Sequence, residues 1–271
     1  MKRHVSPVGA FLLAVIMVVT APGCSLSTSD KATASPSTSA STHTAASPAK
    51  PPEPATPSPA NGGWEEVGTS VQGRPIRVLT LGHGPRKVLF IGGIHGDEPE
   101  GAVATGELPA AFEAAGLADA VTLTIMEDAN PDGRAAGTRD NANGVDVNRN
   151  FPASNFDPSV GGKPLSQPES RAVADTIGRI QPNLVLVAHS WAGRQFINFD
   201  GPAREIADRF AASSGMPVEE SRSFAPTPGS LGSYFGRDLG IPILTIEVLK
   251  GSDPTAVWDQ LRGALLQAIS G

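Results

Sequence analysis

The sequence predicts an α/β fold, a three-layer sandwich with a mixed, mainly parallel sheet flanked by helices. Two observations support this prediction. β-rich runs alternate with helical segments throughout residues 63–271 of the 271-residue chain, an order typical of a mainly parallel sheet covered by helices. One run, Leu184–Val187, is apolar without interruption, as expected for a strand buried on both faces. Residues 63–271 have the length of one domain with its own hydrophobic core.

The expected elements follow one another in a regular order along this domain. The strands are expected over residues 77–81, 87–91, 121–126, 184–187 and 242–248. The helices are expected over residues 98–115, 166–180, 203–213, 229–239 and 254–269. Gly82–Pro85 separates the first two strands as a hairpin or a short loop. Pro109 weakens the first helix, because proline removes a backbone hydrogen bond.

One long segment lacks this regularity. Residues 130–165 contain many Gly, Asn, Asp and Pro residues and little periodicity, and a loop of this length inside a domain is usually functional. His95, His189 and Glu247 fall at or just past the carboxyl ends of expected strands. Ligand sites of α/β folds collect at that edge of the sheet, so we expect the site there.

The first residues have the pattern of an export signal. Lys2 and Arg3 precede an uncharged apolar run, Val8–Val19, which is too short for a membrane span but suits a signal peptide. The run leads into Ala21-Pro22-Gly23-Cys24, which resembles the lipobox of bacterial lipoproteins. We therefore expect residues 1–23 to be a lipoprotein signal peptide and Cys24 to be lipidated. A plain secretory signal with a chance cysteine is the alternative.

The segment after the signal has the composition of a tether. Residues 24–62 are rich in Ser, Thr, Ala and Pro, lack aromatic residues, and contain Leu26 as their one large aliphatic residue. Such a chain cannot bury enough apolar surface to fold. We expect a disordered tether that holds the domain, as a monomer, outside the cytoplasm on the bacterial cell membrane.

Composition excludes several kinds of function. The chain carries 21 Lys and Arg against 27 Asp and Glu, a net charge of −6, so it lacks the basic excess of a nucleic-acid binder. Cys24 is the only cysteine, which excludes an internal disulfide and a cysteine-rich zinc site. His83, His95 and His189 are the only histidines of the domain, and His83 lies in a turn where a surface position is expected.

Histidine and acidic residues occur at a spacing that suits a metal. His95 and Glu98 are three residues apart in Gly92-Gly93-Ile94-His95-Gly96-Asp97-Glu98, where a strand meets a helix. Zn²⁺ accepts imidazole nitrogen and carboxylate oxygen, and a catalytic site takes three protein ligands. On its own the pattern also fits a glutamate that begins a helix beside an incidental histidine.

Arginines and a buried acid add to this pattern. Arg139 and the pair Asn148-Arg149 lie in the glycine-rich loop, where guanidinium groups can grip carboxylates or simply pair with surface acids. His189 ends the buried strand. Glu247 lies within Ile246-Glu247-Val248, and a carboxylate in so apolar a strand needs a partner or a function.

Together these segments strongly resemble the zinc carboxypeptidase family, from about Gly92 to Leu249. The string Gly144-Val145-Asp146-Val147-Asn148-Arg149-Asn150-Phe151-Pro152 is specific to that resemblance. The stretch Gly229–Tyr234 looks most like the bacterial murein peptide amidase A branch. The resemblance implies a zinc carboxypeptidase-like fold, one Zn²⁺ per chain, and hydrolysis of an amide bond beside a free carboxylate. The branch implies muropeptides of the γ-D-glutamyl-diaminopimelate type as substrates.

The resemblance also implies roles for individual residues. The zinc ligands would be His95, Glu98 and His189. Glu247 would be the general base toward zinc-activated water and would then protonate the leaving amine. Arg139 would stabilise the oxyanion of the scissile carbonyl. Asn148 and Arg149 would hold the terminal carboxylate of the substrate.

This sequence departs from the digestive carboxypeptidases at two positions. They carry an arginine just before the ligand glutamate, where this chain has Asp97, so outer subsite contacts should differ. Their substrate-capping tyrosine lies further upstream of the base than Tyr234, the one tyrosine here, so we expect Tyr234 to pack on a helix face.

Parts of the sequence also fit three other functions. Ala188–Gly193 looks like the nucleophile elbow of a serine hydrolase, but no histidine follows Ser190, so the triad order of that fold cannot be completed. An aspartoacylase-like zinc deacylase of N-acyl amino acids would share His95 and Glu98. A lipoprotein that binds wall peptides without cleaving them would have no use for Glu247. The exact scissile bond stays open, because no sequence pattern fixes the side-chain pocket.

Overall fold

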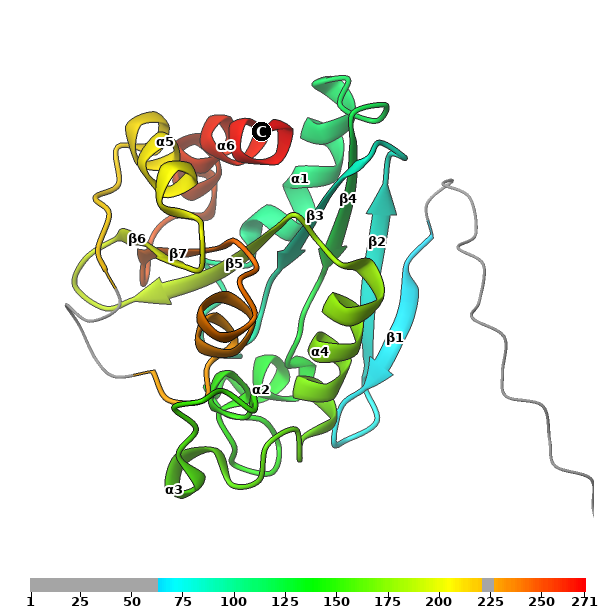
Figure 1. Ribbon diagram of the computed structural model, residues 1–271, viewed down its shortest axis with the longest axis vertical. Helices are drawn as coiled ribbons and strands as arrows, with labels where there is room; N and C mark the ends of the chain where they lie inside the picture. Colours follow the sequence, from blue (N-terminus) through cyan, green and yellow to red (C-terminus); the bar gives the residue numbers. More distant parts are fainter. Residues whose placement is uncertain (1–62, 221–226) are drawn as a thin grey trace, which may run out of the picture. The chain divides into compact units, whose positions relative to one another are not determined.

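The computed structural model describes residues 63–220 and 227–271 (Figure 1). The expected signal peptide, Cys24 and the tether over residues 24–62 lie outside the described residues. Residue 63, the expected first residue of the domain, is also the first residue that the structure describes. The boundary at residue 63 therefore stays a prediction. None of the helices in the described part of the chain has the length and apolar character needed to cross a membrane.

Seven strands of the described chain form a single sheet in the order β1-β2-β4-β3-β5-β7-β6. They are β1 (Glu65–Thr69), β2 (Pro75–Leu81), β3 (Arg86–Ile91), β4 (Val121–Met126), β5 (Leu184–Trp191), β6 (Phe196–Asp200) and β7 (Ile243–Leu249). The four central strands, β4, β3, β5 and β7, are parallel, whereas β2 and β6 run antiparallel to their central neighbours and β1 runs antiparallel to β2. The mixed, mainly parallel sheet is confirmed.

Helices cover both faces of this sheet. They are α1 (Val103–Ala114), α2 (Pro131–Ala136), the short η1 (Val147–Arg149), α3 (Pro158–Gly161), α4 (Pro168–Ile180), α5 (Arg204–Ser214), the π-helix η3 (Gly232–Asp238) and α6 (Pro254–Ser270). One face carries α1, α5 and α6, and the other carries α4 (Figure 1). Helix η3 packs on the α4 side. The three-layer arrangement follows from these two helix layers.

Alternate residues of the central strands enter two different cores. Val88 and Phe90 of β3 pack with α1, α5 and α6, whereas Leu89 and Ile91 pack on the side of α4 and η3. All four side chains are at most 1% exposed. Because both faces are covered, β3 is apolar at each position from Val88 to Ile91, without alternation of polar and apolar residues.

The structure differs from the expected elements at several points. Of the two expected alternatives, Gly82–Pro85 is the short loop and not the hairpin, because β4 lies between β2 and β3. The first helix begins at Val103, five residues later than expected, and continues through Pro109. The expected helix over residues 229–239 contains the π-helix η3. Strands β1 and β6 have no counterpart among the expected elements.

The long loop over residues 130–165 contains short helices that hold it in place. Asn130 caps α2, since its side-chain oxygen accepts the backbone N–H of Gly133 at 2.9 Å. The other end of this amide donates to the backbone oxygen of Arg139 at 3.2 Å. Gly96 and Gly133 approach so closely that a Cβ on Gly96 would lie 1.9 Å from the carbonyl carbon of Gly133. The start of α2 therefore lies directly against the turn that carries His95.

A second residue of this loop ties it to the amino-terminal strands. The carboxylate of Asp132 is 3% exposed and accepts hydrogen bonds from the hydroxyl of Ser70 at 2.8 Å and the backbone N–H of Gln72 at 2.8 Å. It also pairs with the guanidinium of Arg74 at 2.5 Å. Asp132 thus joins α2 to the turn between β1 and β2.

Candidate metal centre and active site

The central strands deliver the candidate residues to one edge of the sheet. His189 lies in β5 and Glu247 in β7, directly opposite each other in the parallel register. Along β5, Val185 and Val187 precede His189 on the same face, because side chains alternate along a strand. This face is apolar under α4 and η3 and becomes polar only toward the carboxyl ends of the strands. His95 comes from the turn after β3.

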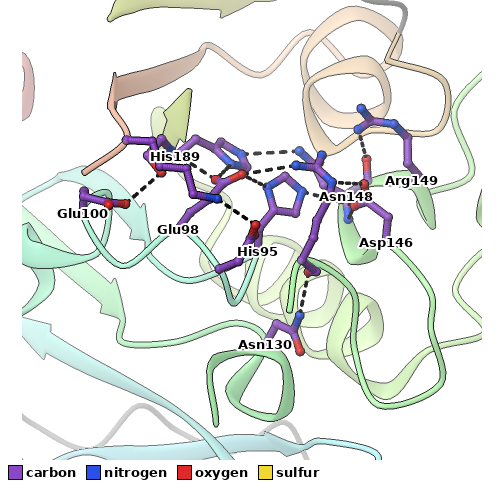
Figure 2. Close-up of polar contacts among 12 residues, drawn as sticks. His95, Glu98, Glu100, Asn130, Asp146, Asn148, Arg149 and His189 are labelled. Atoms are coloured by element: carbon purple, nitrogen blue, oxygen red, sulfur yellow. Dashed lines mark hydrogen bonds and ion pairs between the residues drawn. The ribbon is translucent and has the colours of Figure 1, made fainter. Parts of the chain in front are cut away.

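His95, Glu98 and His189 form a buried group whose donor atoms lie within 4.8 Å of one another. The carboxylate of Glu98 lies between the two imidazoles, 2.9 Å from Nδ1 of His95 and 2.8 Å from Nδ1 of His189 (Figure 2). Each of the three residues is at most 6% exposed. Two imidazoles and one carboxylate are a ligand set of catalytic zinc, which keeps a further position for water or substrate. The donor set therefore fits one Zn²⁺.

Asp146 contacts His95 at Nε2, the ring nitrogen that does not face Glu98. One carboxylate oxygen lies 3.2 Å from Nε2 of His95 and accepts the backbone N–H of Asn148 at 2.8 Å. The other accepts Nε of Arg139 at 2.9 Å. A carboxylate on the far nitrogen of a ligand histidine fixes its orientation and tautomer. No pattern in the sequence predicts this role for Asp146. The one signal in the sequence is its position in the loop, two residues before Asn148.

Nearby positive charge keeps Glu98 ionised. Burial raises the pKa of this carboxyl group, but His189 and His95 lower it through charge and hydrogen bonds, and the net effect is a pKa far below the ordinary value. Arg139 adds a hydrogen bond from Nη1 to Glu98 at 3.2 Å. The group therefore presents a carboxylate anion, the form that binds a metal.

Glu247 has the opposite electrostatic environment. Its side chain is 8% exposed, and one of its carboxylate oxygens, Oε2, has no hydrogen-bond partner among the described residues. Burial raises the pKa of Glu247, the negative charge of Glu98 adds to this effect, and His189 with the two arginines of the site opposes it. A buried carboxyl group with a raised pKa is suited to exchange protons near neutral pH.

The loop residues Asn148 and Arg149 face the same pocket. The side-chain oxygen of Asn148 accepts the backbone N–H of Leu231 at 2.9 Å, and its nitrogen lies 3.4 Å from Nε2 of His189. Arg149 donates one bond, from Nη1 to the backbone oxygen of Asn148 at 2.8 Å. Burial lowers the pKa of Arg149, and repulsion from Arg139 lowers it further, although Asp146 opposes both. An anion bound in this pocket would relieve that repulsion.

One pocket brings together all seven residues expected in the active site. Its lining comprises His95, Glu98, Arg139, Asn148, Arg149, His189, Trp191, Asn198, Asp200, Thr227, Ser230, Gly232, Thr245 and Glu247. Asn198 and Asp200 come from β6 and are not predicted from the sequence. Asp200 pairs with Nε of Arg237 at 3.3 Å. A Cβ on Gly232 would lie 2.1 Å from Oδ2 of Asp200, so glycine at that position makes room for the carboxylate.

Three other residues of interest lie outside the catalytic cluster. The ring of Tyr234 packs against Phe235, with ring centroids 4.8 Å apart, and Tyr234 is absent from the pocket lining, which agrees with a packing role. The hydroxyl of Ser190 donates to Glu100 and not to a histidine. His83 is exposed and lies 3.2 Å from Asp119.

A buried His-Glu-His group at the carboxyl edge of a parallel sheet, with a buried carboxylic acid and two arginines around it, defines a metal-dependent hydrolase. A sequence model of the zinc carboxypeptidase family matches residues 59–207. Murein peptide amidase A of Escherichia coli K12 is 31% identical over 205 residues, which cover 68% of this chain and 81% of the relative. The chain belongs to the zinc carboxypeptidase family. It is accordingly a zinc-dependent peptide hydrolase.

Solved structures agree with this assignment. The murein-tripeptide amidase MpaA of Escherichia coli O157 superposes with a TM-score of 0.60 at 27% identity, over 77% of this chain and 92% of the amidase. Carboxypeptidase A of Helicoverpa armigera superposes with a TM-score of 0.64 at 19% identity, over 77% and 68% of the two chains, and shows the common fold. The zinc carboxypeptidase-like fold is confirmed.

Proposed function

We propose that the chain is a zinc peptidase, held outside the cytoplasm by a lipid anchor, that hydrolyses an amide bond next to a free carboxylate in cell-wall muropeptides. One observation carries the proposal: a single pocket contains the group that suits zinc, the acid Glu247 and the cation Arg149. The similarity to murein peptide amidases supports muropeptides as the substrate class.

In this proposal Glu247 moves the proton. His95, Glu98 and His189 would hold Zn²⁺, which would supply a Lewis acid for the carbonyl oxygen and for water. Glu247 accepts the proton of the attacking water on Oε2, the oxygen that has no partner among the described residues, and passes it to the leaving amine. The raised pKa of Glu247 supports the second transfer, because a weaker acid holds the proton until the amine leaves.

The arginines would position the substrate and stabilise charge. Arg149 with Asn148 would bind the terminal carboxylate of the substrate, since only one bond from its guanidinium, to Asn148, lies within the described residues. Arg139 would face the scissile carbonyl and stabilise its developing oxyanion. The hydrogen bonds of Arg139 to Asp146 and Glu98 support this role, because they hold the guanidinium beside the candidate zinc ligands.

Asp200 supports a substrate whose side chain carries a positive charge. Asp200 belongs to the pocket lining, pairs with Arg237, and lies on β6 opposite Ile243 of β7, whereas Phe196 at the other end of β6 lies opposite Glu247. Diaminopimelate ends its side chain in an ammonium and a carboxylate group, and the carboxylate of Asp200 would bind the ammonium. This feature favours diaminopimelate on the carboxyl side of the scissile bond over an apolar residue.

The decisive experiment is mass spectrometry of muropeptides digested by the zinc-loaded domain. The tripeptide L-Ala-γ-D-Glu-diaminopimelate should release free diaminopimelate, and Glu247→Gln should release it about 10²–10⁴-fold more slowly. Cleavage of N-acyl amino acids in place of the tripeptide would indicate a deacylase. Binding of the tripeptide without cleavage would indicate a wall-peptide-binding lipoprotein.

The side-chain preference has its own test. Asp200→Asn should narrow the difference in kcat/KM between peptides that end in diaminopimelate and matched peptides that end in alanine. Asp259→Asn, a change at an exposed position of α6, is the control and should leave the difference unchanged. If Asp200→Asn keeps the wild-type preference for diaminopimelate, Asp200 does not recognise the substrate. This result would not contradict the proposed cleavage reaction.

The anchor is tested separately from the chemistry. Cys24→Ser should move the protein from the membrane fraction to the soluble fraction and abolish incorporation of labelled palmitate. Equal labelling of the wild type and the variant would show that Cys24 is not the lipidation site.

A further inference from the structure

Glu100 links three segments that meet at the metal centre. One of its carboxylate oxygens accepts the hydroxyl of Ser190 at 2.9 Å, and the other accepts the backbone N–H of Gly251 at 2.7 Å. Ser190 follows His189 in β5, and Gly251 lies two residues beyond the end of β7, the strand that carries Glu247. Glu100 itself lies in the turn that carries Glu98. In Figure 2, Glu100 lies on the opposite side of the metal group from Asp146.

Two further contacts make this turn follow β5 closely. The backbone N–H of Ser190 donates to Oε2 of Glu98 at 3.1 Å. A Cβ on Gly101 would lie 2.8 Å from the backbone nitrogen and oxygen of His189, so the turn touches the strand at that residue. Ser190 therefore binds Glu98 through its backbone and Glu100 through its side chain. The separation between Glu98 and His189 therefore depends on how the turn that carries Glu98 packs against Ser190 of β5.

A second tie joins the same turn to the end of β7. Oδ2 of Asp97 pairs with Nζ of Lys250 at 2.8 Å, next to the bond between Glu100 and Gly251. Lys250 also donates its backbone N–H to the oxygen of Trp191 at 3.0 Å. The Asp97 pair is 32–40% exposed, so it contributes little, whereas both oxygens of Glu100 are engaged in bonds to the two strands.

We propose that Glu100 is a positioning residue of the zinc site: through Ser190 and Gly251 it sets the placement of Glu98 relative to His189 and Glu247. Glu100 is not among the residues that line the pocket, and its hydrogen bonds within the described chain go to Ser190 and Gly251 and not to the zinc ligands. The inference rests on the zinc-binding group and is independent of which peptide the enzyme cleaves. Partners that orient metal ligands typically contribute about 10–100-fold to metal affinity.

The test measures zinc affinity by competition with a chromophoric chelator, with no substrate present. Glu100→Ala and Ser190→Ala should each weaken zinc binding, and Glu100→Ala by about 10–100-fold. The double variant should lose less than the product of the two single losses, because both remove the same hydrogen bond. Glu107→Ala, at an exposed position of α1, is the matched control and should bind zinc as the wild type does.

Two additional readouts separate positioning from general stability. Glu100→Gln keeps an acceptor for Gly251 and an amide that can bond the Ser190 hydroxyl, so it should restore most of the zinc affinity. The visible spectrum of the Co²⁺-substituted protein should shift in Glu100→Ala, as expected for altered ligand geometry, and return in Glu100→Gln. Wild-type zinc affinity in Glu100→Ala, or a lower Tm of the metal-free variant without a change in zinc affinity, would overturn the proposal. The proposal would also be overturned if the loss of zinc affinity in the double variant equalled the product of the two single losses.

Discussion

Replacing Arg149 with alanine should remove the preference of the enzyme for substrates with a free terminal carboxylate. Arg149 lines the pocket, and within the described residues its guanidinium makes one hydrogen bond, to the backbone oxygen of Asn148, so it has N–H groups left to bind an anion. Truncating one partner of a buried charge pair costs about 2–5 kcal/mol. At about 1.4 kcal/mol per tenfold change, kcat/KM for the free-acid peptide should fall roughly 30- to 5000-fold.

The assay compares a peptide acid with its carboxamide for the wild type and for Arg149→Ala. In the wild type the amide should lose a factor of the same order, because the missing contact also orients the scissile bond. In the variant the two substrates should be hydrolysed with similarly low efficiency. Arg262→Ala, at an exposed position of α6, controls for the loss of a positive charge and should keep the wild-type preference. Equal wild-type rates on acid and amide would refute the reasoning, and so would an undiminished preference in Arg149→Ala.

Three other predictions concern the base, the metal and stability. Glu247→Gln should lower kcat by about 10²–10⁴-fold while zinc content, measured by elemental analysis, stays at one per chain. His189→Ala should lose zinc and activity together, and full zinc occupancy in that variant would contradict the assignment. Burial raises the pKa of Asp132, but its three hydrogen-bond donors outweigh burial and lower it. Asp132→Asn should therefore cost about 1.5–3 kcal/mol of unfolding free energy at pH 7. Because a lowered folded-state pKa stabilises only above the unfolded value of about 3.9, the difference from wild type should shrink as denaturation is measured below that pH. A constant difference down to pH 2 would contradict this.

The sequence predicted the buried strands well and the edge strands poorly. Strand β4 was expected at its observed bounds, and the expected β5 began at the right residue, since strands covered on both faces are rich in apolar and β-branched residues. Strand β1 reads Glu-Glu-Val-Gly-Thr and is mostly exposed, so its pairing depends on backbone hydrogen bonds that leave no pattern in the side chains. The position of β4 between β2 and β3 is set by long-range packing, and short connections such as Gly82–Pro85 do not reveal it.

The candidate site likewise contains residues that the sequence predicted and residues that it did not. The structure brings His95, Glu98 and His189 into one group and adds Glu247 and both arginines to its pocket, as the spacing and the family resemblance led us to expect. Asp200 and Glu100 could not be predicted in the same way. Asp200 enters the pocket only because β6 pairs with β7 and Gly232 of η3 makes room for it. Glu100 gains its contacts from the way the turn after β3 packs on β5 and β7.

The placement of β1 also determines how the domain would respond to mechanical load. Among the described residues, a pull from the amino-terminal side acts first on β1, an edge strand whose one partner in the described sheet is β2. Antiparallel edge pairing can open one rung at a time, from Glu65 toward Thr69, so this strand should peel off at low force. The unzipping then reaches the turn that Asp132 ties to α2 through Ser70 and Arg74. Asp132 should therefore act as a mechanical stop, and load that reaches it should pass into α2, which lies against the turn carrying His95.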